Sequence, residues 1–226
     1  MDYKLQAAQR ALEYVHSGMC LGLGTGSTSV QFIGLLALRL QSGVLRDLRA
    51  VPTSDATARR AHELGIPLTT LSETPCLDLA VDGADEVDPR LNLIKGLGMA
   101  LLREKIVEMQ ARQLIIIVDE SKIVQQLGRG PLPVEIVPFE AEFNVRWLNT
   151  LGCRAELWRD KQGLPFVTDN GNYLARCWFS SIPDAYALAR AFSDRPGIVE
   201  HGLFLDMVSR VIVSGRAGVR ILEREK

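Results

Sequence analysis

Four charged residues within one short stretch have the side-chain types needed for proton transfer. Asp82 and Asp85 lie in a Gly-Ala turn directly after an apolar run, Lys95 opens a glycine turn, and Glu104 follows on a predicted helix. A carboxylate can take a proton from carbon, and a lysine can stabilise the negative charge that develops on a neighbouring oxygen. The stretch from Val81 to Glu108 therefore predicts general acid–base chemistry.

The helix after the glycine turn is predicted to bury Met99, Leu102, Ile106 and Met109, which recur three and four positions apart. At 100° per residue, Glu104 lies on the other side of this helix. Its neighbours one turn away are apolar, so we expect its carboxylate to be partly withdrawn from water. Such withdrawal makes a carboxylate more basic, as proton abstraction requires.

Each of these residues also has a purely structural interpretation. An Asp-Gly turn commonly shapes the chain without taking part in chemistry. A lysine beside glycines is usually solvated, and the Arg-Glu-Lys triplet around Glu104 is typical of an exposed charge cluster. The placement of the residues favours catalysis, because they follow an apolar run and open a helix, where α/β sheets carry their sites.

A second glycine-rich turn, from Gly22 to Ser29, connects an apolar run to a predicted helix. Such a turn presents backbone N–H groups and the positive end of the helix to an anion. The hydroxyls of Thr25, Ser27 and Thr28 suit a single phosphate group better than a pyrophosphate, and neither the dinucleotide nor the P-loop pattern occurs. The alternative is a tight structural turn in which Ser27 caps the helix.

Apolar runs typical of strands alternate with helical patterns over the first 130 residues. The run at 114–118 is continuously apolar, as in a strand that is covered on both faces. This alternation predicts an α/β fold with a parallel sheet, whose strand exits would meet along one edge. Polar residues occupy four such exits, at 24–28, 53–55, 82–85 and 119–122.

The pattern changes at the Gly- and Pro-rich segment 128–133. Two helices and about four strands follow, with a hairpin turn at 170–172, and they predict a small α+β unit of ferredoxin-like type. We therefore expect a first domain of residues 1–130 plus 203–226, interrupted by a second domain of residues 131–202.

The composition argues against several classes of function. The formal net charge is −1 and the pI about 6.3, so there is no basic field for a nucleic acid or an anionic membrane. Four scattered cysteines and three histidines form no metal-binding pattern, and we expect neither a metal site nor a disulfide framework. Because no apolar signal or membrane-spanning segment is recognisable, the predicted location is the cytoplasm.

Six motifs, in order along the chain, resemble those of the type A ribose-5-phosphate isomerase family: GLGTGSTS, DGADEVDP, KGLGMALLREKIV, DESK, TDNGN and GIVEHGLF. The resemblance runs along almost the whole chain. It implies a Rossmann-like α/β domain interrupted by a smaller domain, and interconversion of ribose 5-phosphate and ribulose 5-phosphate through an enediol. It also implies that no metal or other cofactor is needed and that the protein is a homodimer or homotetramer.

The same resemblance implies roles for individual residues. Glu104 corresponds to the general base, and Asp82, Asp85 and Lys95 complete the catalytic set. The residues implied to bind the substrate and its phosphate are Lys4, Thr25, Gly26, Ser27, Thr28, Gly83, Ala84, Gly96, Leu97, Gly98 and Lys122.

Two positions depart from the family pattern. Leu97 stands where the family usually has glycine, and a leucine there would be strained if the turn required a positive φ. Arg176 lies where the family commonly has an acidic residue after the TDNGN motif, and we expect it to alter packing or assembly rather than chemistry.

Two other hypotheses remain open at this stage. The first is a related sugar-phosphate enzyme or an acyl-CoA transferase of the same broad fold. The transferase would use a glutamate as a nucleophile, and trapping of a covalent thioester would reveal it. The second is a non-enzymatic sugar-phosphate sensor, such as the effector half of a transcription regulator. Such a regulator would need a DNA-binding segment, for which the charge and the length of the chain leave no room.

Overall fold

The computed structural model describes residues 2–224, and the chain packs as two compact units. Unit 1 contains the chain up to Ala84, the segment Arg103–Ile123 and the chain from Asp206 onward. Unit 2 contains Asp85–Leu102 and Val124–Leu205. Close packing does not by itself mark an independently folding domain. The domain boundaries expected from the sequence, at 130/131 and 202/203, therefore stay a prediction.

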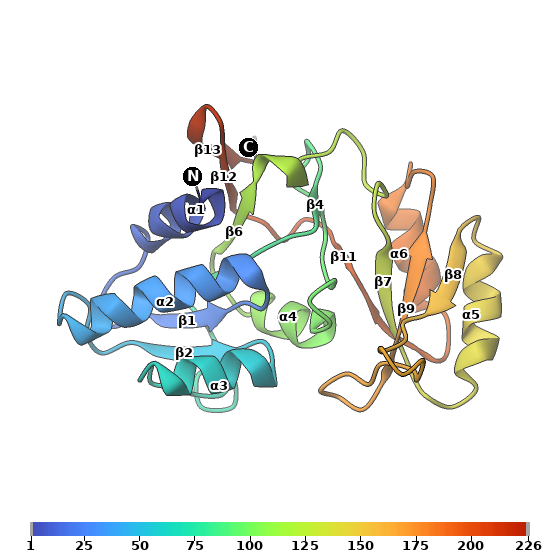
Figure 1. Ribbon diagram of the computed structural model, residues 1–226, viewed down its shortest axis with the longest axis horizontal. Coiled ribbons are helices and arrows are strands. Elements are labelled where there is room, and N and C mark those ends of the chain that lie inside the picture. The colour runs from blue at the N-terminus through green and yellow to red at the C-terminus, as the bar shows by residue number, and fades with distance from the viewer. Residues whose placement is uncertain (1, 225–226) are drawn as a thin grey trace. The chain divides into compact units, whose positions relative to one another are not determined.

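Unit 1 is built on a six-stranded sheet in the order β13-β12-β6-β3-β1-β2 (Figure 1). Its strands are β1 (Cys20–Leu23), β2 (Arg49–Pro52), β3 (Leu79–Asp82), β6 (Leu114–Asp119), β12 (Arg210–Gly215) and β13 (Gly218–Glu223). Neighbouring strands are parallel except β12 and β13, which form an antiparallel hairpin. The carboxyl ends of β1, β2, β3 and β6 therefore lie at one edge of the sheet, as the sequence predicted.

Side chains cap the N-termini of two helices of unit 1. Its helices are α1 (Tyr3–Leu12), α2 (Ser27–Gln41), α3 (Asp55–Glu63) and most of α4 (Leu101–Glu108), followed by the short 3₁₀ turn η1 (Glu120–Lys122). Asp2 accepts hydrogen bonds from the first N–H groups of α1, and Ser54 accepts one from Thr57 at the start of α3. These side chains satisfy donors that a helix start leaves without an intrahelical acceptor.

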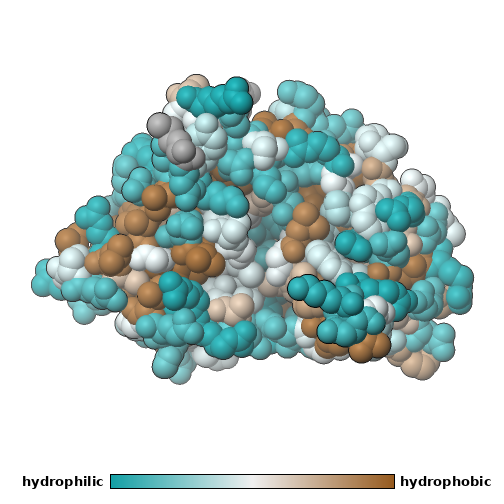
Figure 2. Space-filling model, in the orientation of Figure 1, coloured by the Kyte–Doolittle hydropathy of each residue, from teal (hydrophilic) through white to brown (hydrophobic). Residues whose placement is uncertain are grey.

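The core of unit 1 lies where α1 and α2 pack on the sheet. Leu21, Leu23, Phe32, Ile33 and Leu36 are almost completely buried there. The opposite side of α2 is not uniformly polar, since Val30 and Leu38 are exposed. Figure 2 shows hydrophobic and hydrophilic residues intermixed on this part of the surface. Among the described residues, no helix is both long and apolar enough to cross a membrane.

Unit 2 contains a four-stranded antiparallel sheet in the order β10-β7-β9-β8. Its elements follow the chain as β7 (Leu132–Ile136), α5 (Ala141–Asn149), β8 (Arg154–Leu157), β9 (Tyr173–Trp178), α6 (Ala185–Ser193) and β10 (Ile198–His201). This β-α-β-β-α-β order is the ferredoxin-like arrangement that the sequence predicted. Three short strands, β4 (Glu86–Val87), β5 (Leu93–Ile94) and β11 (Leu203–Phe204), form a second small sheet.

Candidate active site

The loop between β1 and α2 is shaped by two glycines. A Cβ on Gly24 would lie 2.0 Å from the carboxylate of Asp82, so a larger residue would collide with that side chain. Gly26 is the N-cap residue of α2 and has a φ of +119°, in the region that favours glycine. No side chain caps the start of this helix. Because Gly26 is the N-cap, the alternative in which Ser27 caps the helix is wrong.

The hydroxyls of this loop have different surroundings. Thr25 Oγ1 is within hydrogen-bond distance of the hydroxyls of Thr53 (2.7 Å), Ser54 (2.9 Å) and Thr57 (3.1 Å). It therefore ties the exit of β1 to the exit of β2. Ser27 Oγ instead accepts a hydrogen bond of 2.9 Å from Lys4 Nζ, which comes from the first turn of α1. This contact brings a cation to the N-terminus of α2, the end of a helix that attracts anions.

Asp82 is fully buried at the carboxyl end of β3. Its Oδ1 accepts hydrogen bonds of 2.7 Å from the Ser29 hydroxyl and of 2.7 Å from the Gly83 backbone N–H. Ser29 is on the first turn of α2, so these bonds fix Asp82 beside the glycine-rich loop. Gly83 and Ala84 continue the chain from this point to the end of the first segment of unit 1.

Glu104 is buried on α4, with 2% of its surface exposed. Glu108 follows one helical turn later and is 3% exposed. One carboxylate oxygen from each of Asp82, Glu104 and Glu108 can be chosen so that the three atoms lie within 4.8 Å of one another. The expected withdrawal of Glu104 from water is thus confirmed, and the carboxylate lies next to the end of β3.

The apolar stripe predicted on α4 is wrong in its second half. Ile106 is 47% exposed and Met109 is 65% exposed, whereas the face of α4 that carries Glu104 is buried. Periodicity identifies residues that share a face of a helix, but tertiary packing decides which face is covered. In this helix the covered residues include Leu101 and Val107 as well as Glu104 and Glu108.

Asp85 and Lys95 belong to unit 2. Asp85 Oδ2 accepts a hydrogen bond of 2.9 Å from the backbone N–H of Leu97. Lys95 is 2% exposed, its backbone N–H donates to the Gly202 carbonyl, and its Nζ lies 5.4 Å from the centre of the Phe204 ring. Asp85 therefore holds the glycine turn that Lys95 opens.

In the turn that Lys95 opens, the positive φ angles belong to residues other than Leu97. Gly96 has a φ of +107° and Met99 a φ of +67°, whereas Leu97 does not have a positive φ. A glycine at position 97 is therefore not needed for the backbone conformation, and the strain considered for this departure does not arise. Gly98 completes the turn and is exposed.

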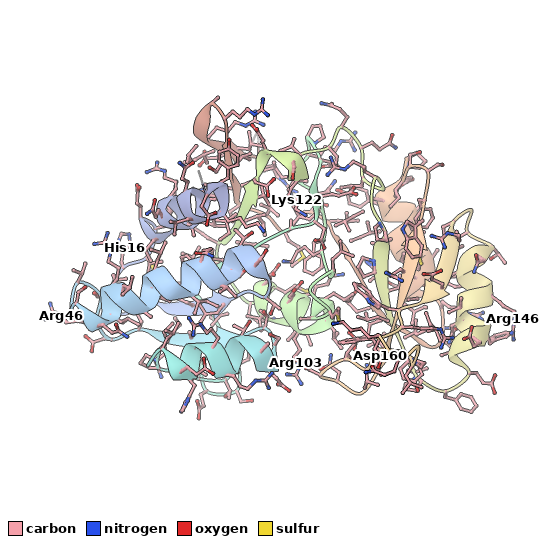
Figure 3. The ribbon with its side chains drawn as sticks, in the orientation of Figure 1. His16, Arg46, Arg103, Lys122, Arg146 and Asp160 are labelled. Atoms are coloured by element: carbon pink, nitrogen blue, oxygen red, sulfur yellow. The ribbon has the colours of Figure 1, made fainter. Side chains whose placement is uncertain are left out.

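Lys122 ends the η1 turn directly after β6 and is labelled in Figure 3. Asp119, the last residue of β6, precedes the turn and accepts a 2.9 Å hydrogen bond from the Ser121 N–H. Burial raises the pKa of Asp119, but hydrogen bonds from Ser121 and the charges of Lys122 and Lys4 outweigh it, so the pKa is lowered overall. Asp119 is thus an anion near both lysines.

The spacing of Asp82, Glu104 and Glu108 would also suit the oxygen ligands of a divalent cation. Buried carboxylates also lie close together at sites of proton transfer that hold no metal. The expectation that the protein needs no metal therefore stays a prediction, and chelation tests it.

Comparison with known proteins identifies the family. Residues 49–218 match the model of ribose 5-phosphate isomerase A, also called phosphoriboisomerase A. The chain belongs to this family. The ribose-5-phosphate isomerase A of Roseiflexus castenholzii is 52% identical over 222 residues, which cover 98% of this chain and 95% of that protein. A probable ribose-5-phosphate isomerase 2 of Arabidopsis thaliana is 46% identical, over 97% of this chain and 86% of that protein.

Solved structures agree with this assignment and extend over the whole fold. The ribose 5-phosphate isomerase of Plasmodium falciparum superposes with a TM-score of 0.94 at 39% identity, over 99% of this chain and 98% of that chain. A ribose-5-phosphate isomerase in complex with phospho-erythronic acid gives a TM-score of 0.96 at 41% identity, over 99% of this chain and 100% of that chain. The predicted fold class is therefore confirmed. The comparisons give no support to the transferase, related-enzyme or sensor hypotheses.

Sequence reasoning missed three residues around the predicted site. Ser29 anchors Asp82, Glu108 adds a third buried carboxylate, and Asp119 stands beside two lysines. The four-residue spacing of Glu104 and Glu108 was a usable signal, since such residues share one face of a helix. Asp119 was signalled by its place at the exit of a buried strand.

Proposed function

We propose that Glu104 is the general base with which this isomerase interconverts ribose 5-phosphate and ribulose 5-phosphate. The observation that carries the proposal is the burial of Glu104 on α4, beside the end of β3 and the glycine-rich loop. A carboxylate withdrawn from water can take the proton from the carbon next to the carbonyl and return it to the neighbouring carbon. The intermediate between these two transfers is an enediolate.

The negative charge of the enediolate requires stabilisation on oxygen. Lys95, from the family motif KG-x-G, is the cation proposed for this role, together with the N–H groups of the turn Gly96–Gly98. Asp82 and Asp85, from the motif DGAD, are proposed to move protons among the substrate hydroxyls or to assist ring opening. Gly83 and Ala84 belong to the same motif and are proposed as substrate contacts.

The substrate phosphate is proposed to bind at the start of α2. Lys4 already contacts Ser27 there, and the N-terminal N–H groups of α2 have no acceptor within their own helix. Lys122 supplies a second cation, and the loop Thr25–Thr28 supplies the backbone. Binding energy from the phosphate would hold the reacting carbons at Glu104.

An assay of ketose formation from ribose 5-phosphate tests the overall function. Ser27→Phe should weaken the binding of both ribose 5-phosphate and inorganic phosphate, because the side chain would fill the space at the helix start. Gln41→Phe, on the last turn of α2, is a matched control that leaves the helix start unchanged. Normal binding of both ligands by Ser27→Phe would show that the loop is only a structural turn.

We also propose that the protein is a homodimer or homotetramer and that it is located in the cytoplasm. The four cysteines are free thiols, which fits a reducing compartment. Light scattering on the purified protein would give the mass of the assembly, and a monomeric mass at working concentration would contradict the first part.

A further inference from the structure

Asp119 is an acidic residue at the place where the proposed function puts a phosphate. It lines a cavity of about 510 Å³ together with Asp2, Tyr3, Lys4, Ser27 and Gln31. Two of these residues, Lys4 and Ser27, are joined by the 2.9 Å hydrogen bond at the start of α2. A carboxylate at this point would repel a phosphate dianion if it acted alone. Its presence therefore needs an explanation.

The carboxylate of Asp119 is held in place. Its Oδ1 accepts a 2.9 Å hydrogen bond from the Ser121 N–H and a second, short hydrogen bond from the Ser121 hydroxyl. Asp119 is partly buried at the end of β6, where the strand pairs with β12 up to Ser214. The side chain is therefore a fixed negative charge, whereas lysine side chains are long and flexible.

Two lysines interact electrostatically with this charge. Lys122 lies on the η1 turn that Asp119 precedes, and Lys4 lies on α1. The positive charges of both lysines lower the pKa of Asp119. Two ammonium groups directed at one phosphate repel each other and lose rotamer freedom when they are ordered. A fixed anion near both offsets these costs before the substrate arrives.

We propose that Asp119 is a positioning residue, which holds Lys4 and Lys122 ready for the substrate phosphate at the start of α2. This inference rests on the proposed function of that loop. The proposal requires that the gain in phosphate binding from the positioned lysines is larger than the loss from direct repulsion between Asp119 and the phosphate. The two effects have opposite signs, so the binding of phosphate by a neutral variant distinguishes them.

The experiment compares Asp119→Asn with the native protein. Asparagine keeps the shape of the side chain and an oxygen that accepts from Ser121, but it removes the charge. We expect KM for ribose 5-phosphate and the dissociation constant for inorganic phosphate to rise together, by roughly three- to tenfold. The value of kcat should change by less than about twofold, because the carbon-proton step takes place at Glu104. Tighter binding of inorganic phosphate by Asp119→Asn would overturn the proposal.

Two further variants separate positioning from a structural role. Ser121→Ala removes the hydroxyl that holds Asp119 but keeps the charge, so its KM should rise less than that of Asp119→Asn. Equal effects of the two variants, with equal losses of thermal stability, would mean that Asp119 only shapes the turn and would overturn the proposal. In a Lys4→Met background, the effect of Asp119→Asn on phosphate binding should shrink, since part of what Asp119 holds is gone. An undiminished effect would count against action through Lys4.

Phosphate binding also keeps this inference separate from the proposed function. If the native protein binds inorganic phosphate but does not form ketose, the proposed isomerase mechanism fails, while Asp119→Asn still tests the positioning role. If native binding and turnover are both normal and Asp119→Asn matches the native protein in both, the positioning role alone fails.

Discussion

Both units of the molecule bury carboxylates, and the grouping of these carboxylates differs between the units. Glu135 on β7 of unit 2 is fully buried, and its Oε1 accepts hydrogen bonds from Thr168 (3.0 Å), Asn170 (3.1 Å) and Asn172 (2.9 Å). All three donors are neutral and come from one turn. In unit 1 the carboxylates of Asp82, Glu104 and Glu108 lie beside one another, and Asp82 also accepts hydrogen bonds from Ser29 and Gly83.

We propose that this difference separates a structural carboxylate from a reactive one. The three neutral donors all bind one oxygen of the Glu135 carboxylate, and these hydrogen bonds hold the turn at 168–172 in place. Glu86 on β4 also accepts from neutral donors, the backbone N–H groups of Gly128, Arg129 and Gly130. Carboxylates that are grouped in one buried cluster are instead typical of sites that carry out acid–base chemistry.

The largest expected effect comes from Glu104→Gln. Glutamine keeps the shape of the side chain but cannot take a proton from carbon. Turnover should therefore fall by roughly 10²–10⁴-fold, with little change in substrate binding. Exchange of solvent deuterium into the sugar should be lost as well, since exchange needs the base even without net conversion.

Glu108→Gln is the matched control for this change. It removes the same charge, from the same helix and at the same burial, one turn away. It should retain deuterium exchange, and its turnover should fall far less than that of Glu104→Gln. If Glu104→Gln exchanged deuterium at the native rate, the base would lie elsewhere, and Asp82 or Asp85 would be the next candidate.

The two units differ in how well their buried carboxylates could be predicted from the sequence. The burial of Glu104, the proposed base, was predicted from its apolar neighbours, and the Asn-Gly turn at 170–172 was predicted from turn chemistry. The partner of that turn, Glu135, gave no signal, because its donors lie more than thirty positions away and only the fold brings them together. For the same reason, the separation of Asp82 and Asp85 into different units could not be read from residues three positions apart.

Local backbone conformation set a second limit on prediction. The sequence drew attention to Leu97, because glycine is usual there, yet the positive φ falls on Gly96 and Met99. Methionine rarely adopts that conformation, so no residue-level rule would have indicated position 99. The buried face of α4 was misjudged for a different reason, because tertiary packing decides which face is covered and leaves the apolar Ile106 and Met109 exposed.

Glu135→Ala should reduce stability and leave the chemistry intact. The substitution leaves the side chains of Thr168, Asn170 and Asn172 without their shared acceptor, which should cost about 1–3 kcal/mol in the free energy of unfolding. Urea denaturation measures this loss, and kcat per folded molecule should stay near the native value. Glu156→Ala, at an exposed carboxylate in the same unit, should cost clearly less. Equal costs for the two variants would contradict the structural role of Glu135.

Removal of metal ions should leave activity unchanged. The carboxylates of Asp82, Glu104 and Glu108 are close enough to hold either a proton or a cation. We expect no metal there, because the family resemblance implies none and the proposed role of Glu104 is that of a base. Activity after prolonged dialysis against a chelator decides the matter. Loss of activity that a divalent ion restores would show that the cluster in unit 1 is a metal site.

Among the substitutions, the smallest effect is expected from Leu97→Gly, which concerns a third kind of carboxylate contact. Asp85 accepts its hydrogen bond from the backbone N–H of Leu97, and this donor is present whatever the side chain. Because Leu97 has no positive φ, glycine relieves no strain there. We expect kcat and KM to change by less than about threefold, and stability to fall by up to about 1 kcal/mol from the added freedom of the unfolded chain. Steady-state kinetics and urea denaturation of the same sample test both statements. A large gain in substrate affinity would mean that the leucine side chain obstructs the site, and a large loss of turnover would mean that it positions Asp85 through more than the backbone.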